Sequence, residues 1–175
     1  MRSTMLRAAH FTGALATFSL WASGIGLVLM TVFITWQVFG RFVLNDTPTW
    51  TESVSVIIMG WFIFLGAAVG IREGYHLSFD VMLHILPRRV RKILHTVSDT
   101  VVIAFGGGMA GFGLQLAQQT WSSTIPNVGW PVGVTYLALV FGGFLMVLFS
   151  IERVLRRFAG LSTVRFADID NTDGD

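Results

Sequence analysis

Hydrophobic and polar positions are distributed along this chain in long blocks. Residues 8–40, 53–71 and 100–151 contain no Lys, Arg, Asp or Glu, which gives uncharged blocks of 33, 19 and 52 residues. The hydrocarbon core of a bilayer is about 30 Å thick and needs about 20 apolar residues per helix. The first two blocks therefore predict one transmembrane helix each. The third block predicts two helices with an uncharged connection.

These helices predict a single all-α integral membrane domain over residues 1–160. We expect its spans at about 14–39, 53–71, 93–118 and 131–151. The first is expected to stay uncleaved, because its apolar stretch is longer than the about 7–15 residues of a signal peptide core. Residues 161–175 are rich in aspartate, which predicts a disordered tail.

The segment 72–92, between the second and third spans, is the most polar internal part of the chain. Its apolar residues recur at helical spacing, whereas Asp80 and His84 lie on another side. The apolar residues are Phe79, Met82, Leu83 and Leu86. This pattern predicts a short amphipathic helix in the membrane interface.

The distribution of Lys and Arg predicts the orientation of the domain. Eleven of these residues lie near the two termini or in the 72–92 segment, and Arg41 alone lies on the other side. Cytoplasmic loops of membrane proteins carry an excess of Lys and Arg. We therefore expect both termini, the tail included, and the 72–92 segment in the cytoplasm.

Composition excludes several other classes of function. Charged residues make up 13% of the chain, about half the share of a globular protein. The basic residues stand in short segments beside apolar runs, which indicates orientation in a membrane rather than a nucleic-acid partner. There is no cysteine, so thiol catalysis, disulfides and cysteine-based metal sites are excluded.

The residues that could support catalysis or bind a cofactor are sparse. The histidines are at positions 10, 76, 84 and 95, and none falls in the middle of a predicted span. No metal-binding motif, nucleophile motif or phosphate-binding loop is present. We expect no enzymatic activity, no cofactor, and no catalytic or metal-binding residue. A haem- or quinone-associated membrane anchor of a respiratory enzyme stays open as an alternative, as does a scaffold with no link to transport.

Asp99 is the charged residue predicted deepest in the membrane, about two turns into the third span. Ionisable residues inside a membrane are functional candidates by default. Three arginines near the predicted cytoplasmic surface are candidate partners, namely Arg72, Arg153 and Arg156. Such a pair indicates a structural role, and a self-sufficient transporter is not favoured, because no array of buried carboxylates or broken-helix repeat is evident.

Several motifs, in this order, resemble the small membrane subunit of TRAP transporters, the DctQ type. They are Trp50–Glu52 (W-x-E), Phe64–Asp80 (FLGAAVGIREGYHLSFD), Leu86-Pro87 before a basic cluster, Ile125-Pro126, Trp130-Pro131 and Tyr136–Ala138. The resemblance covers roughly residues 15–157.

The resemblance implies a scaffolding role in tripartite, ATP-independent, sodium-driven uptake across the bacterial inner membrane. The implied partners are a large membrane subunit that holds the sodium and substrate sites, a periplasmic substrate-binding protein, and membrane lipids. The implied substrates are organic anions, and their identity depends on residues of the other subunits.

Five residues of this chain are candidates for a subunit interface or for a structural role: Glu52, Arg72, Glu73, His76 and Asp80. We expect them to set helix ends and the interfacial segment, through ion pairs or through contacts with the large subunit. The alternative is ordinary helix capping and charge in a solvated loop.

Overall fold

The protein is described by a computed structural model, which covers residues 2–73 and 88–158. Its helices are α1 (Arg2–Phe39), α2 (Trp50–Glu73), α4 (Arg88–Gln119) and α5 (Gly133–Phe158). A π-helical segment of five residues, η1 (Gly40–Leu44), continues α1 without a break.

Each of the four helices contains a stretch that is long and apolar enough to cross a membrane. These stretches are Thr12–Leu44, Trp50–Glu73, Ile93–Gln119 and Gly133–Leu155. The prediction of an all-α chain with four such helices is confirmed. The predicted interfacial helix falls largely on residues 74–87, which lie outside the described residues.

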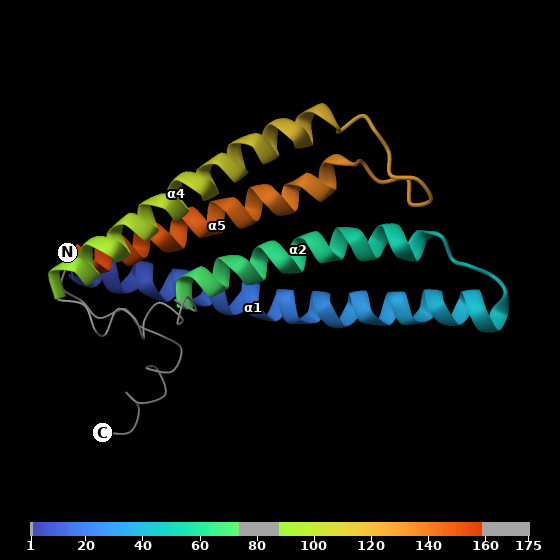
Figure 1. The fold of residues 1–175 in the computed structure, drawn as a ribbon, viewed down its shortest axis with the longest axis horizontal. Helices are drawn as coiled ribbons and strands as arrows, with labels where there is room; N and C mark the ends of the chain where they lie inside the picture. Colours follow the sequence, from blue (N-terminus) through green and yellow to red (C-terminus); the bar gives the residue numbers. More distant parts are fainter. Residues whose placement is uncertain (1, 74–87, 159–175) are drawn as a thin grey trace, which may run out of the picture.

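The helices lie in a row in the order α1, α2, α5, α4 (Figure 1). α1 and α2 form one antiparallel hairpin, and α4 and α5 form another. The hairpins meet where α2 packs against α5. As a result α2 and α5 lie inside the row, whereas α1 and α4 lie at its edges.

Small side chains allow α1 and α2 to approach closely. The Ser23 hydroxyl donates a hydrogen bond of 2.8 Å to the Phe62 carbonyl oxygen of α2. A Cβ added at Gly66 would lie 2.8 Å from Ser23 Oγ, so this glycine is required for the contact. Lipid provides little hydrophobic force between helices, so such close packing and interhelical hydrogen bonds stabilise the pair.

The glycines of α4 divide into two groups. Gly106 and Gly113 face α5, and a Cβ at Gly106 would lie 2.9 Å from the carbonyl oxygen of Gly143. A Cβ at Gly143 would in turn lie 2.6 Å from the Gly106 oxygen. The other three glycines of α4 have open space around them in the described part of the chain, and they are Gly107, Gly108 and Gly111. Among the described residues, only the first group is needed for helix packing.

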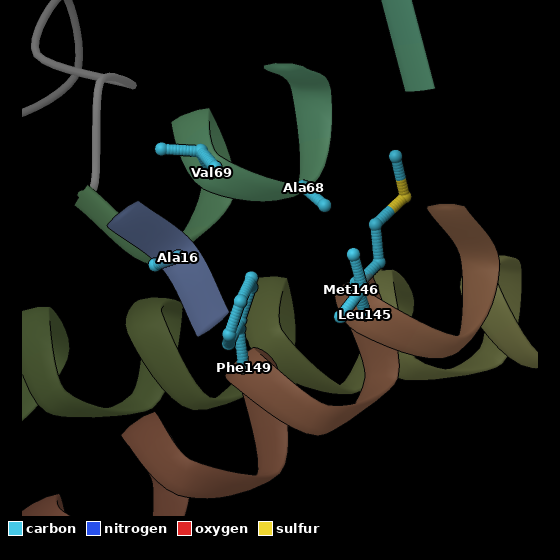
Figure 2. Packing of buried hydrophobic residues seen from close by; sticks show 6 residues of the cluster. All are labelled: Ala16, Ala68, Val69, Leu145, Met146 and Phe149. Carbon is cyan, nitrogen blue, oxygen red and sulfur yellow. The ribbon is translucent and has the colours of Figure 1, made fainter. Parts of the chain in front are cut away.

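A hydrophobic core joins the two hairpins near one end of the bundle (Figure 2). The ring of Phe149 on α5 is 1% exposed and lies among small and aliphatic side chains of α1 and α2. The other core residues are Ala16, Ala68, Val69, Leu145 and Met146. The small residues at positions 16 and 68 leave room for the Phe149 ring.

The two groups of α4 and α5 glycines predict a difference in stability. Gly143→Ala should lower the free energy of unfolding by about 1–3 kcal/mol, because its methyl group has no space against α4. Gly107→Ala should not lower it, and the higher helix propensity of alanine should raise it by up to about 1 kcal/mol. Thermal unfolding of both purified variants in detergent measures this, and equal stability of the two would contradict the close α4–α5 contact.

Candidate functional site

Five charged side chains converge where the end of α2 meets α4 and α5. This charged cluster consists of Arg72 and Glu73 of α2, Asp99 of α4, and Glu152 and Arg153 of α5. The side chains are between 4% and 16% exposed. Burial of an isolated charge is costly, so buried charges occur together with opposite charges.

Arg72 links α2 to α5 beside α1. Its Nη1 atom lies 3.4 Å from Glu73 Oε1, and its Nε atom lies 3.8 Å from Glu152 Oε2. The guanidinium carbon also lies 5.7 Å from the centre of the Phe149 ring, a distance suited to a cation–π contact. The charged cluster and the hydrophobic core are therefore continuous at this arginine.

Arg153 links α5 to both α2 and α4. Its Nη2 atom donates hydrogen bonds to the carbonyl oxygens of Ile71 and, at 3.0 Å, of Arg72. Its Nη1 atom lies 3.6 Å from Asp99 Oδ1. The last carbonyl groups of a helix have no amide partner within that helix. Arg153 supplies this partner for α2 and places a positive charge at the negative end of its dipole.

The charged cluster fixes the point at which the chain leaves α2. The carbonyl groups of the last turn are bound to α5, and the guanidinium that binds them is itself bound to α4. This arrangement suits a structural junction of three helices, because Arg72 pairs with Glu152 of α5 and Arg153 pairs with Asp99 of α4. Within the described ranges, no group of three or more His, Asp or Glu side chains is placed to hold a metal ion.

The structure brings two of the five predicted residues together. Arg72 and Glu73 lie in the charged cluster, and Glu73 is buried. Glu52 is exposed in the first turn of α2, at the opposite end of that helix. His76 and Asp80 lie outside the described residues.

Glu152 and Arg153 were not among the predicted site residues. Asp99, by contrast, was expected to pair with one of three arginines, and the structure shows Arg153 as its partner. The sequence contains a signal for both missed residues, since they directly follow the uncharged block 100–151. Charged residues that directly follow an apolar span lie at the membrane surface. There they can pair with charged residues at the ends of neighbouring spans.

An apolar groove of about 430 Å³ lies between α1 and α2. It is lined by aliphatic and aromatic side chains, among them Phe18, Trp21, Ile25, Phe62 and Leu65. Specific recognition of a polar ligand requires a few placed polar groups. The lining of this groove suits a hydrocarbon chain or apolar side chains rather than an organic anion.

A family model decides which family this chain represents. The model describes the DctQ component of tripartite ATP-independent periplasmic transporters, and it matches residues 30–160. The chain belongs to this DctQ family. The resemblance seen in the sequence motifs is thereby confirmed, and the family is a transporter component rather than a family of enzymes. The alternative of a respiratory anchor is not favoured.

Several TRAP transporter small permease proteins are similar in sequence to this chain. The C4-dicarboxylate TRAP transporter small permease protein DctQ of Vibrio cholerae is 29% identical over 104 residues, which are 59% of this chain and 44% of that protein. The sialic acid TRAP transporter small permease protein SiaQ of the same species is 23% identical over 128 residues, 73% of this chain and 74% of that protein. DctQ of Pseudomonas aeruginosa is 27% identical over 139 residues, covering 70% and 64%. This DctQ-family chain thus spans less than half of the Vibrio DctQ protein.

The junction at Arg153 predicts strong coupling between two residues. Arg153→Met should lower the free energy of unfolding by about 3–5 kcal/mol, because it leaves Asp99 buried without this partner. Asp99→Asn should cost clearly less in the Arg153→Met background than in the natural chain. Thermal unfolding of the two single variants and the double variant measures this coupling.

Arg41→Met is the matched control, since Arg41 is an exposed arginine far from the charged cluster. It should leave the free energy of unfolding nearly unchanged. Additive effects of Arg153→Met and Asp99→Asn would show that the ion pair contributes nothing to the junction.

Proposed function

We propose that this chain is the small membrane subunit of a sodium-driven, ATP-independent transporter that takes up organic anions across the bacterial inner membrane. The observation that carries the proposal is the DctQ family match over residues 30–160. Two relatives are named for C4-dicarboxylate and sialic acid transport, and both compounds are organic anions. The four apolar helices suit a multi-pass inner-membrane protein.

The distribution of charge supports a scaffolding role for this subunit. Between Glu52 and Arg72, and again over residues 100–151, the chain contains no charged residue. The described charges that are buried, from Arg72 to Arg153, gather in one cluster and pair with one another. Binding of sodium and of an anion within the membrane is therefore assigned to a large membrane subunit, to which a periplasmic binding protein delivers the substrate.

The proposed orientation places the charged cluster on the cytoplasmic side. Both termini, the tail 161–175 and the 72–92 segment then lie in the cytoplasm, where eleven of the twelve Lys and Arg residues fall. An interfacial helix within 72–92 belongs to this proposal, as does the single domain 1–160. Arg72, Glu73, His76 and Asp80 would then contact the large subunit or set helix ends at that surface, and Glu52 would do so at the other.

Reconstituted uptake tests the proposed function. Proteoliposomes that contain this chain and its large membrane subunit should accumulate an organic anion when the binding protein and an inward sodium gradient are supplied. Omission of this chain should reduce the initial uptake rate by at least about tenfold, and this chain alone should transport nothing. Full uptake without this chain, or without the sodium gradient, would contradict the proposal.

The absence of cysteine allows a direct test of orientation. Ser122→Cys, in the connection between α4 and α5, should react with a membrane-impermeant maleimide in intact spheroplasts. Ser3→Cys, near the start of α1, should react only after the membrane is opened. The reverse pattern of labelling would place the termini in the periplasm.

A further inference from the structure

Contacts between helices show which residues lie at the same depth in the bundle. Arg72 of α2 pairs with Glu152 of α5, and Arg153 pairs with Asp99 of α4. On α1 the same depth is reached at Gly13, because a Cβ added there would lie 3.6 Å from Arg72 Nη2. The charged cluster therefore gives a common reference for all four helices.

Three helices match the thickness of a bilayer when measured from this reference. A count of about 20 residues corresponds to about 30 Å, the thickness of the hydrocarbon core. Counted from Arg72, it leads to Glu52 near the start of α2, and counted from Asp99, it leads to Gln119 at the end of α4. Counted from Glu152, it leads to the residue before Gly133, where α5 begins. Measured along its own axis, each of these three helices thus ends about one bilayer thickness from the charged cluster.

α1 extends farther than this from the charged cluster. The same count from Gly13 leads to Phe33, whose ring contacts the ring of Trp50 at a centroid distance of 5.8 Å. The helix continues through Phe39 and η1 to Leu44, which adds about 16 Å at 1.5 Å per residue. Figure 1 shows this end of α1 reaching beyond the connection between α4 and α5. We call residues 34–44 the α1 overhang.

The overhang exposes a large apolar surface. Seven of its large hydrophobic side chains are between 39% and 74% exposed. They are Ile34, Trp36, Val38, Phe39, Phe42, Val43 and Leu44. Tilting would bring all of Thr12–Leu44 into the hydrocarbon core only at an angle of about 50°, above the usual range of 0–40°. The contact of Phe33 with Trp50 also ties α1 to the shorter α2.

The overhang is a built structure rather than a frayed end. A Cβ at Gly40 would lie 2.7 Å from the carbonyl oxygen of Asp46 and 3.0 Å from Pro48 Cδ, so the returning chain packs directly on this glycine. The Asp46 amide donates a hydrogen bond of 3.1 Å to the Gly40 oxygen. Asn45 adopts the left-handed conformation, with φ of 52°, that ends η1.

We propose that the α1 overhang docks on an apolar surface of the large membrane subunit outside the hydrocarbon core, an inference that rests on the proposed function. Ile34, Val38 and Phe42 recur at helical spacing and are 39% to 74% exposed, so one partner can cover them together as the apolar centre of an interface. Permanent interfaces are more hydrophobic than transient ones. This favours a permanently bound membrane subunit over a soluble binding protein, which must leave after each delivery.

Capture of this chain by a tagged large subunit tests the proposal. In cells that produce both, Phe42→Ala combined with Val43→Ala should lower the amount of chain captured by at least about tenfold. Phe105→Ala combined with Phe112→Ala is the matched control on α4, where these rings are 63% and 69% exposed. The control should stay within about twofold of the natural chain. Equal capture of both double variants would overturn the overhang as the docking surface.

A second measurement leaves the aromatic character of the overhang intact. Replacement of Phe42 by the photo-reactive benzoylphenylalanine should give a covalent adduct with the large subunit, whereas the same replacement at Phe112 should not. Adducts with a second copy of this chain, or with lipid alone, would overturn the proposal. Failure of the natural chain to be captured at all would overturn the proposed function as well, and this distinguishes the two.

Discussion

The contact of Arg153 with α2 and α4 is the interaction on which the arrangement of the bundle depends. One guanidinium binds the last carbonyl groups of α2 and the carboxylate of Asp99. In lipid, apolar helix faces gain little from meeting each other, so polar contacts and close packing decide which helices pair. Arg153 provides the polar contact at one end, and small residues provide the close packing along the rest. The polar contact of Arg153 and the close packing of small residues together hold the helices in the row α1, α2, α5, α4.

The same junction relates the structure to function. Because its charges are engaged with each other, the chain can be held firmly in the membrane while offering no charged site at mid-depth. It also sets the level from which the helices are measured. Against this level α2, α4 and α5 match a bilayer, whereas α1 is longer. The paired interior and the one long, apolar outer helix support the proposal that this subunit holds a partner rather than moves a solute itself.

The sequence predicted the helices well because uncharged blocks report membrane spans directly. It also predicted that Asp99 would pair with an arginine near the membrane surface. It could not select Arg153, since this choice depends on the order of the helices in the row.

The glycines of α4 show the same limit, because the sequence does not state which of them face α5 and which face outward. Gly40 and Arg41 resembled the end of a span, yet the helix continues through them as η1. Glu52 and Arg72 were predicted on either side of the span 53–71, and they lie at opposite ends of α2.

The central claim is that this DctQ-family chain works as a stable subunit beside a larger membrane partner. Native mass spectrometry of the chain, purified in mild detergent from cells that also produce the large subunit, tests for such a complex. We expect a complex of one copy of each protein that survives loss of the detergent. Detection of the chain alone, or only with further copies of itself, would show that no stable pair of subunits forms.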